Sequence, residues 1–467
     1  MKYTEIYCFG LYLSMELNIK TNDITLHKLF ITQKLSMFFP EIERKSKKEI
    51  IDFQEHKLRE MISYISSQSK FYQEWFLQHK INTLSIKTIK DLQNIPPVNK
   101  DHLQKYNNDF VCVPKNKIID YITTSGTLGD PVTFAMTDFD LNRLAYNEAI
   151  SFACAGATEN DVFQLMTTMD RRFMAGLAYF MGVRKLGAGI IRVGNGIPEL
   201  QWDSIIRLNP SILIAVPSFI LKIIDYAEKN NIDYHNTSIR KAICIGEPLR
   251  NPDFGLNTLG KKIKEKWDIE LYSTYASTEM GSAFTECQHG IGGHLHPELI
   301  IVEFLDENNN NVPEGEAGEV TITSLGVEGM PLLRFKTGDV CHFHTEPCLC
   351  GRTTTRLGPI IGRKKQMIKY KGTTLYPPAL YDVLNNIDYV VNYVVEVSTN
   401  TLGTDDILIR IGCNKTDEGF EKTVKDHFRA KLRVAPEVII ESPEVIQKII
   451  FPETNRKPMQ FIDKREN

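Results

Sequence analysis

The sequence predicts a layered α/β protein with a large N-terminal part and a smaller C-terminal one. Its 467 residues exceed what a single hydrophobic core normally holds, so we expect two or three domains. Between about residues 110 and 340, short apolar runs alternate with segments of helical periodicity, which is the pattern of an α/β architecture. The runs that predict buried strands lie at residues 162–166, 190–193, 212–216 and 242–245.

The regions on either side of this core show different patterns. Apolar residues at helical spacing between about residues 46 and 80 predict an amphipathic helix and a helical N-terminal region. The turn-rich run at residues 308–318 predicts a hairpin and a β-rich subdomain, and the composition changes after Gly362. We therefore expect a helical part at 1–110, the main α/β part at 111–362 and a small α+β domain at 363–467.

Composition and charge exclude several classes of protein. A net charge of -3 and a pI near 6.4 argue against nucleic-acid binding, which normally needs a basic surface. No run approaches the 18 apolar residues of a membrane span, and Glu5 and Glu16 interrupt the apolar stretch that a signal peptide would need. We therefore expect a cytoplasmic protein. Its nine cysteines fit reduced thiols or a metal site better than a disulfide framework.

The stretch T-T-S-G-T-L-G-D-P at residues 123–131 is the most informative of the chain. It follows an apolar, β-branched lead-in, and Gly126 and Gly129 permit the positive φ angles that let backbone N–H groups and hydroxyls converge on one anion. We interpret it as a polyphosphate cradle. The spacing differs from that of a P-loop and no lysine follows, which disfavours a Walker-type nucleotidase. A Ser/Thr/Gly surface loop explains this stretch equally well when it is taken alone.

Four later segments supply the other groups that a nucleotide needs. Residues 246–248 follow a predicted strand, where parallel strands commonly meet a ligand, and residues 272–279 offer an aromatic face, hydroxyls and a carboxylate. Asp339 follows a turn and can bind vicinal ribose hydroxyls, and residues 362–372 begin the last domain. Taken singly, Asp339 is most simply a turn residue and Glu279 a helix N-terminal acid. In this order, the segments together indicate one kind of enzyme.

The constellation resembles the adenylate-forming superfamily of acyl-CoA ligases, luciferases and peptide-synthetase adenylation domains, and most closely its phenylacetate-CoA ligase branch. The resemblance runs from about Tyr121 to Arg465. Likeness to the branch depends on residues 173–178 with Gly182, Gly187 and Ala188, on residues 216–218, on the G-E-P form of residues 246–248, and on Glu286-Cys287 leading to residues 348–351. The resemblance implies an ATP- and acyl-binding large domain and a small mobile C-terminal domain.

The resemblance also implies an activity. Such an enzyme uses ATP and Mg²⁺ to convert a carboxylic acid to an acyl-adenylate and pyrophosphate, and a thiol, usually CoA, then displaces AMP. Attack of a carboxylate on the α-phosphate joins two anions, so catalysis is mainly positioning and charge neutralisation.

The resemblance assigns each site residue a role. Thr124, Ser125, Gly126, Thr127 and Gly129 would hold the β- and γ-phosphates, Glu279 would bind Mg²⁺, and Tyr275, followed by Ala276, Ser277 and Thr278, would stack on adenine. Gly246, Glu247 and Pro248 would line the adenine pocket, Asp339 would take the ribose hydroxyls, Arg363 would lie near the nucleotide, Lys365 would be the hinge, and Lys457 would be the mobile catalytic lysine.

Three positions depart from the family pattern. Leu128 stands where a second threonine is usual, and Arg456 and Pro458 flank Lys457. A solvated terminal lysine is therefore the alternative interpretation of Lys457. These departures also keep open a nucleotide-binding protein that has lost catalysis.

Cysteines form a second constellation. Cys348 and Cys350 lie close in sequence, and Cys287 precedes a histidine-rich loop; three thiolates and one imidazole suit a tetrahedral structural Zn²⁺. The resemblance aligns His294 as the fourth ligand, with His296 second. Unrelated reduced cysteines and a polar histidine loop are the alternative.

The acyl substrate is predicted only by class. Candidates for its wall come from segments that flank the nucleotide motifs: Tyr121, Phe134, Phe173, Met174, Ala215, Pro217, Ile245 and Ala276. They are mostly apolar and no Arg or Lys is committed to a second carboxylate, so we expect a monocarboxylic aryl or medium-sized acid. The expected partners are this acid and CoA, with a homodimer possible and without nucleic acid or membrane. An enzyme that passes the acyl group to a protein thiol or an amine is the first alternative.

Overall fold

The computed structural model describes residues 40–124, 132–370, 373–400, 405–414, 419–452 and 458–465. Its centre is a six-stranded sheet of order β4-β3-β5-β6-β7-β8. These strands are β3 (Val162–Leu165), β4 (Gly189–Arg192), β5 (Ile212–Ala215), β6 (Lys241–Cys244), β7 (Glu270–Ser277) and β8 (Ser282–Thr285). Strands β4 to β7 are parallel, and β8 is antiparallel to β7. The four strands predicted from apolar runs are confirmed.

One of those strands differs from its prediction in burial. Strand β4 is the edge strand, and its ends are exposed, whereas β5 is buried throughout. An edge strand lacks a neighbour on one side, so the apolar run alone could not show that it would be only half covered. The prediction of a buried strand at residues 190–193 is therefore wrong in burial, although right in type.

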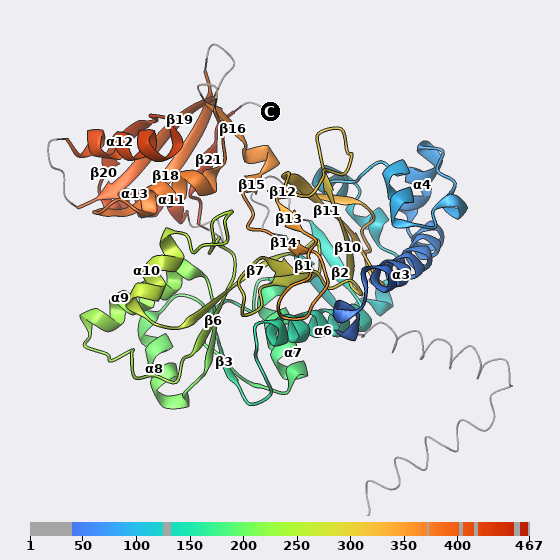
Figure 1. Ribbon diagram of the computed structural model, residues 1–467, viewed down its shortest axis with the longest axis horizontal. Coiled ribbons are helices and arrows are strands. Elements are labelled where there is room, and N and C mark those ends of the chain that lie inside the picture. The colour runs from blue at the N-terminus through green and yellow to red at the C-terminus, as the bar shows by residue number, and fades with distance from the viewer. Residues whose placement is uncertain are drawn as a thin grey trace, which may run out of the picture.

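Helices cover both faces of this sheet. The alternation of side chains along β5 places Leu213 and Ala215 in one core and Ile212 and Ile214 in another. The first core includes residues of α8 (Pro198–Leu208), α9 (Pro217–Lys229) and α10 (Thr258–Lys266), and the second includes residues of α6 (Asp138–Cys154) and α7 (Met174–Leu186). The predicted α/β layering is confirmed, and Figure 1 shows α8 to α10 beside the sheet.

The N-terminal region is helical as predicted, but the expected helix is two helices. They are α3 (Lys47–Gln68) and α4 (Lys70–Gln78), followed by α5 (Lys100–Lys105). Ser69 adopts an extended backbone conformation, ends α3 and caps α4 by accepting a hydrogen bond from the Tyr72 N–H through its hydroxyl. Serine is common inside helices as well as at caps, so periodicity alone did not reveal the break. Short 3-10 helices are η2 (Pro40–Arg44), η3 (Thr83–Ser85), η4 (Ile89–Asn94), η5 (Asn107–Phe110), η6 (Lys115–Lys117) and η7 (Lys364–Gln366).

A β-rich part packs between the helical region and the central sheet. Its main sheet has the order β10-β11-β12-β15, and the turn predicted at residues 308–318 joins β10 to β11 as an antiparallel hairpin. The bounds are β1 (Asp120–Thr123), β2 (Thr133–Met136), β9 (Gly293–His294), β10 (Ile300–Leu305), β11 (Gly318–Ser324), β12 (Phe335–Cys341), β13 (Phe343–His344), β14 (Arg356–Leu357) and β15 (Gly362–Arg363). Strands β1 and β2 form a hairpin, and β13, β14 and β9 form a small sheet.

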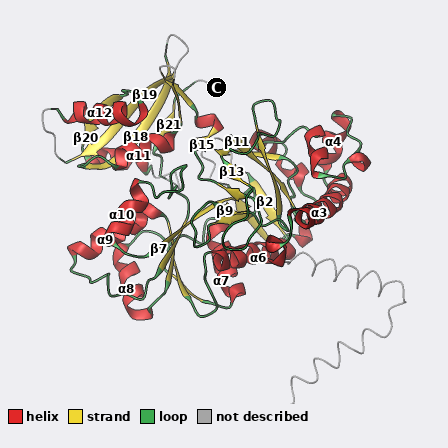
Figure 2. Ribbon diagram, in the orientation of Figure 1, coloured by secondary structure: helices red, strands yellow, loops and turns green. Residues whose placement is uncertain are grey.

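The last part of the chain has its own hydrophobic core, and we call residues 368–465 the C-terminal lobe. Its four-stranded sheet has the order β20-β19-β18-β21. The elements are β16 (Ile368–Tyr370), β17 (Thr373–Leu375), α11 (Pro377–Asn385), β18 (Val390–Thr399), β19 (Asp405–Cys413), α12 (Phe420–Leu432), β20 (Glu437–Glu441), α13 (Pro443–Ile450) and β21 (Phe461–Asp463). Figure 2 shows this α+β lobe apart from the larger body. Within the described residues, no helix is long and apolar enough to cross a membrane.

Candidate functional site

The carboxyl edge of the central sheet brings several predicted residues together. Strands β5, β6 and β7 run parallel, with Ala215 opposite Cys244 and Cys244 opposite Ser273. The carboxyl ends of these strands and the segments that follow them therefore lie at one edge. The end of β7 carries Tyr275, Ala276 and Ser277, and the segments after the strands carry Pro217, Gly246, Glu247, Pro248 and Thr278. This edge is where ligands bind in open α/β sheets. The positive φ of Gly246, +75°, turns the chain directly after β6.

Asp339 joins this edge from the neighbouring β-rich sheet. The Tyr275 hydroxyl donates a 2.8 Å hydrogen bond to Asp339 Oδ2, and Arg363 Nε donates one of 3.1 Å to Oδ1. Arg363 reaches this position because it lies opposite Asp339 in the register of β12 and β15. Burial, with the adjacent Asp339 carboxylate, raises the pKa of Tyr275 well above its ordinary value. The two donors therefore hold Asp339 in place, only 7% exposed.

Glu279, the predicted Mg²⁺ ligand, has a cationic neighbour. Lys100 Nζ lies 3.6 Å from Glu279 Oε1, and the side chain of Glu279 is 13% exposed. Lys100 begins α5 in the N-terminal helical region and is far from Glu279 in sequence. No sequence motif pointed to Lys100, because a lysine at the start of a helix is common. The pair places a positive charge beside the carboxylate.

The carboxylate of Glu247 is hydrogen-bonded to another residue of the protein. It accepts hydrogen bonds from Ser218 N at 2.9 Å and from Ser218 Oγ at 2.8 Å, at the start of α9. A carboxylate at a helix N-terminus is favoured by the exposed N–H groups there. Burial nevertheless raises the pKa of Glu247. Its role in the predicted adenine pocket stays a prediction, and in this geometry Glu247 fixes the G-E-P segment to α9.

The phosphate loop is described only at its two ends. The Val132 N–H donates a 3.1 Å hydrogen bond to Thr124 Oγ1, so the two strands β1 and β2 converge on this loop. The other predicted phosphate ligands, Ser125, Gly126, Thr127 and Gly129, lie outside the described residues, as does the predicted catalytic Lys457. Their roles stay predictions.

The predicted hinge, Lys365, lies in η7 between the two parts of the chain. Its Nζ is 3.0 Å from Asp101 Oδ1, and its backbone carbonyl accepts a 3.1 Å hydrogen bond from Arg465 Nη2. Arg465 also donates to the carbonyl of Met367 at 2.7 Å. Arg465 therefore bonds to the backbone at and just after the residue that the resemblance implies is the hinge.

The four predicted zinc ligands are gathered in one cluster. Cys287, His294, Cys348 and Cys350 each offer one ligand atom, and these four atoms all lie within 4.8 Å of one another. The two cysteines of the C-x-C pair reach the cluster from the loop before β14, whereas His294 lies in β9, the neighbour of β14 in the small sheet. Three of the four residues are buried.

The separations inside the cluster fit a tetrahedral zinc ion. Cys287 Sγ and Cys348 Sγ are 3.7 Å apart, and Cys350 Sγ is 3.5 Å from His294 Nε2. Tetrahedral bonds of about 2.3 Å to sulfur and about 2.0 Å to nitrogen place two sulfurs about 3.8 Å apart and a sulfur and a nitrogen about 3.5 Å apart. The donor set and its spacing therefore suit Zn²⁺.

The surroundings of the cluster also orient His294 and shift the pKa values of His294 and Cys350. His294 Nδ1 lies 3.3 Å from Thr354 Oγ1, which leaves Nε2 free to face the thiols. Burial lowers the pKa of His294 to about 3, so the imidazole is neutral at pH 7. Burial opposes ionisation of Cys350, but hydrogen bonds from Arg352 outweigh it and lower the pKa of this thiol. A neutral imidazole and a thiolate are the forms that bind metal.

His296, the second candidate for the fourth ligand, is bound to residues outside the cysteine cluster. Its Nε2 lies 3.0 Å from Ser151 Oγ and its Nδ1 lies 2.5 Å from Glu43 Oε1, and its side chain is buried. The ring is therefore bound to a serine and a glutamate and does not belong to the cysteine cluster. Residues two apart share one face only while the chain stays in a strand. Because β9 ends at His294, the chain does not hold His296 on the face that carries His294.

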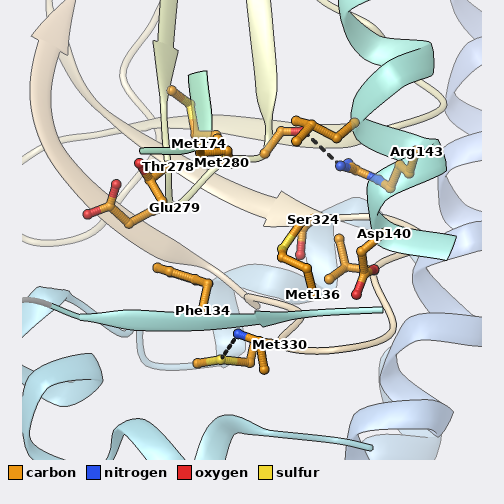
Figure 3. A pocket seen from close by; sticks show the side chains of 14 residues that line it. Phe134, Met136, Asp140, Arg143, Met174, Thr278, Glu279, Met280, Ser324 and Met330 are labelled. Carbon is orange, nitrogen blue, oxygen red and sulfur yellow. Dashed lines mark hydrogen bonds between the residues drawn. The ribbon is translucent and has the colours of Figure 1, made fainter. Parts of the chain in front are cut away.

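A small apolar cavity lies next to Glu279. Figure 3 shows Phe134 and Met136 on one side and Met174, Thr278 and Met280 on the other. Its volume is about 30 Å³. Of the eight residues predicted for the acyl wall, Phe134 and Met174 line this cavity, whereas Tyr121, Phe173, Ala215, Pro217, Ile245 and Ala276 do not. Ala215 and Pro217 are buried at the carboxyl edge of β5 instead, and Tyr121 is exposed on β1. Their assignment to the acyl pocket stays a prediction.

Two carboxylates with cationic partners and an aromatic ring thus stand at the carboxyl edge of a parallel sheet, where open α/β folds bind nucleotides and other ligands. Comparison with known proteins agrees. The AMP-binding enzyme family matches residues 30–329, more than half of the chain, and the chain belongs to this family. The predicted membership of the adenylate-forming superfamily is thereby confirmed.

Individual relatives add detail. The phenylacetate-coenzyme A ligase of Thermus thermophilus is 28% identical over 360 residues, which are 76% of this chain and 79% of that protein. A crystal structure of 2-hydroxyisobutyryl-CoA ligase in the postadenylation state, in complex with an acyl-AMP, has a TM-score of 0.80 at 22% identity and covers 91% of this chain and 92% of that one. The same ligase in the thioesterification state, with CoA, has a TM-score of 0.66 at 23% identity and covers 92% of each chain.

Proposed function

We propose that this protein is an acid–CoA ligase. It activates a carboxylic acid with ATP to an acyl-adenylate and pyrophosphate, and then transfers the acyl group to CoA with release of AMP. One observation carries the proposal: Asp339, held by Tyr275 and Arg363, stands at the carboxyl edge of the sheet in a member of the AMP-binding enzyme family. Relatives named phenylacetate-coenzyme A ligase and 2-hydroxyisobutyryl-CoA ligase support it.

The charges of the site suit the first half-reaction. The acid and the α-phosphate are both anions, so the enzyme has to position them and neutralise charge. Asp339 offers acceptors to the ribose hydroxyls, and Arg363 and Lys100 supply positive charge beside Asp339 and Glu279. Mg²⁺ bound through Glu279 would neutralise phosphate oxygens, which it prefers as ligands. Lys457 would add a cation during adenylation and leave before thiolysis.

The acid is most consistent with one carboxylate and an apolar body. In the cavity beside Glu279, Arg143 is the cation, and its guanidinium already donates to the carbonyls of Gly281, Leu299 and Leu325 at 2.7, 2.6 and 2.9 Å. Asp140 is likewise bound to the N–H groups of Glu328 and Gly329. Among the described residues that line this cavity, no cation is therefore free to bind a second carboxylate. An aryl or arylacetic acid agrees with this and with the names of the relatives.

The second component of the proposal is a structural Zn²⁺ held by Cys287, His294, Cys348 and Cys350. The separations of the four ligand atoms and the neutral state of His294 support it. The ion would bind β9 to the loop before β14 and so stabilise the β-rich part on the way to the C-terminal lobe. A cytoplasmic location and a homodimer stay predictions of the sequence.

A half-reaction assay tests the activity. Purified protein is mixed with ATP, Mg²⁺ and a panel that contains phenylacetate, benzoate, a medium-chain fatty acid and a dicarboxylate, and pyrophosphate release is measured. We expect release with an aryl monocarboxylate and little with the dicarboxylate. CoA-dependent AMP release then separates a CoA ligase from an enzyme that uses a protein thiol or an amine. ATP binding without pyrophosphate release for any acid would support the binding protein that has lost catalysis.

Lys457 has a test of its own. Lys457→Ala should retain ATP binding and should still transfer the acyl group to CoA from a supplied acyl-adenylate, but pyrophosphate release should fall by several orders of magnitude. Normal pyrophosphate release in this variant would show that Lys457 is the solvated terminal lysine of the alternative interpretation.

A further inference from the structure

A hydrogen bond joins the C-terminal lobe to a helix end in the large part of the molecule. Asp382, in α11, accepts a 3.1 Å hydrogen bond through Oδ1 from the backbone N–H of Thr258. Thr258 is the first residue of α10, and the first N–H groups of a helix have no partner inside it. The N-cap residue Asn257 satisfies the N–H of Gly260 at 2.9 Å. The lobe thus supplies a cap that the helix itself does not provide.

Further contacts place α11 against α10. Lys262 Nζ, one turn into α10, donates a hydrogen bond to the carbonyl of Asn385 at the end of α11. Asn385 also accepts a 3.0 Å bond from the Tyr393 hydroxyl, so this end of α11 is fixed within the lobe. Together the two contacts hold the C-terminal turn of α11 against α10. A carboxylate near a helix N-terminus is also favoured by the helix dipole.

The capped helix end is connected to the candidate nucleotide site. Asn257 Nδ2 donates a 2.8 Å hydrogen bond to the carbonyl of Pro248, and Asn257 N donates one of 3.0 Å to the carbonyl of Leu249. Pro248 belongs to the G-E-P segment after β6. The lobe is therefore linked to this short loop through Thr258 and Asn257, which are neighbours in the chain.

The arrangement of the lobe resembles one of two states of a related ligase. The two solved states of 2-hydroxyisobutyryl-CoA ligase share one sequence, and this chain covers nearly the same share of each. The higher TM-score with the postadenylation state therefore reflects how the parts of the molecule are placed. The Asp382 contact belongs to that placement, and a lobe that turned toward the other state would exchange its contacts with the large part.

We propose that Asp382 is a positioning residue that holds the C-terminal lobe in the orientation for adenylation by capping α10. The inference rests on the proposed two-step function. Lys457 belongs to the lobe in sequence. It precedes β21, which pairs with β18 inside the lobe. Loss of the cap shifts the population of the lobe away from this orientation. One cap biases an equilibrium by about 5-fold, which is enough to alter a rate and weak enough to break in every cycle.

Three variants separate this role from a purely structural one. Asp382→Ala removes the cap, and Asp382→Asn keeps an acceptor oxygen but removes the charge. Lys431→Ala is the matched control: Lys431 Nζ lies 3.7 Å from Asp382 Oδ2, and both residues belong to the lobe. This control removes the ion pair inside the lobe and leaves the bond to Thr258 in place.

The first measurement does not need activity. Hydrogen–deuterium exchange of the full-length protein reports protection of the first turn of α10. We expect faster exchange at residues 256–262 in Asp382→Ala, a smaller increase in Asp382→Asn and none in Lys431→Ala. Equal exchange in Asp382→Ala and the unaltered protein would overturn the proposal, even if the protein were an active ligase. This arm remains informative if no acid is activated.

The second measurement divides the two half-reactions. With an acid that the enzyme activates, pyrophosphate release should slow about 5-fold in Asp382→Ala. CoA thiolysis of a supplied acyl-adenylate should be unchanged or faster, and Asp382→Asn should recover part of the first rate. Equal slowing of both half-reactions, or the same loss in Lys431→Ala, would show that Asp382 only stabilises the lobe and would overturn the proposal.

Discussion

The cysteine cluster and the nucleotide edge differ in whether their polar groups have partners elsewhere in the protein. At the edge, each carboxylate already has a protein partner: Asp339 has Tyr275 and Arg363, and Glu279 has Lys100. In the cluster, the ligand atoms of Cys287, His294, Cys348 and Cys350 face one another. The first arrangement keeps charges satisfied until a ligand replaces their partners. The second gathers soft donors around a space the size of one metal ion.

This difference has a physical reason. A substrate site must be stable both empty and filled, and partners such as Lys100 lower the cost of holding a carboxylate between turnovers. A structural metal stays bound throughout, so its ligands need no alternative partners, and the binding free energy becomes folding free energy. We therefore expect changes in the cluster to alter stability and changes at the edge to alter ligand affinity.

Removal of the metal should have the largest effect. Elemental analysis of the purified protein should find about one zinc ion per chain. Cys350→Ser should lose the ion and lower the free energy of unfolding by more than about 3 kcal/mol, because three ligands bind zinc far more weakly than four. Thermal denaturation with and without a chelator measures this. Cys112→Ser, at a buried thiol outside the cluster, is the control, and metal-free protein of full stability would remove the zinc proposal.

A buried carboxylate in α6 should also make stability depend on pH. Burial raises the pKa of Glu148 to about 7, and Glu148 Oε2 has no hydrogen-bond partner among the described residues. The folded state therefore binds this proton more tightly than the unfolded state, and stability falls as pH rises from about 4.5 to 7, by about 3 kcal/mol.

Glu148→Gln isolates this contribution, because glutamine cannot titrate. The free energy of unfolding, measured between pH 5 and 8, should decline less steeply in the variant than in the unaltered protein. The absolute stability is the weaker measure, since the new amide N–H₂ would need an acceptor. Parallel pH profiles for the two proteins would show that Glu148 does not carry this proton.

At the nucleotide edge, Asp339→Ala should weaken ATP binding by 10-fold or more. The carboxylate can offer charge-assisted hydrogen bonds to the ribose, each worth about 1.5–3 kcal/mol. Calorimetric titration measures the affinity. Tyr275→Phe keeps the ring and removes one hydrogen bond to Asp339. We expect its ATP affinity to fall by less than about 10-fold. The melting temperature should fall less in both variants than in Cys350→Ser.

The smallest effect is expected at the exposed pair of Lys365 and Asp101. Their side chains are 67% and 62% exposed, and such pairs contribute at most about 1 kcal/mol. Asp101→Ala should therefore leave stability and ATP affinity nearly unchanged. A large loss in either measurement would mean that this ion pair, and not only the backbone of the hinge, sets the orientation of the lobe.

Much of the fold could be predicted from the sequence. The apolar runs that became β3, β5 and β6, and the turn-rich hairpin between β10 and β11, are local patterns, because a strand buried on both faces is apolar along its length. Family membership followed from short motifs in a fixed order. The break between α3 and α4 at Ser69 and the exposure of β4 were not predicted, because each depends on what packs nearby.

The residue types of both sites could be predicted from sequence motifs: the hydroxyl- and glycine-rich loop, Asp339, Glu279 and the cysteines with His294. Their partners could not, because they depend on the fold. Lys100 forms an ion pair with Glu279, and Asp382 caps α10. His294 lies against the thiols, whereas His296 bonds to Glu43. These contacts join residues far apart in the chain. Motif chemistry is local and can be read along the chain, whereas the choice of partner depends on how separate elements pack in three dimensions.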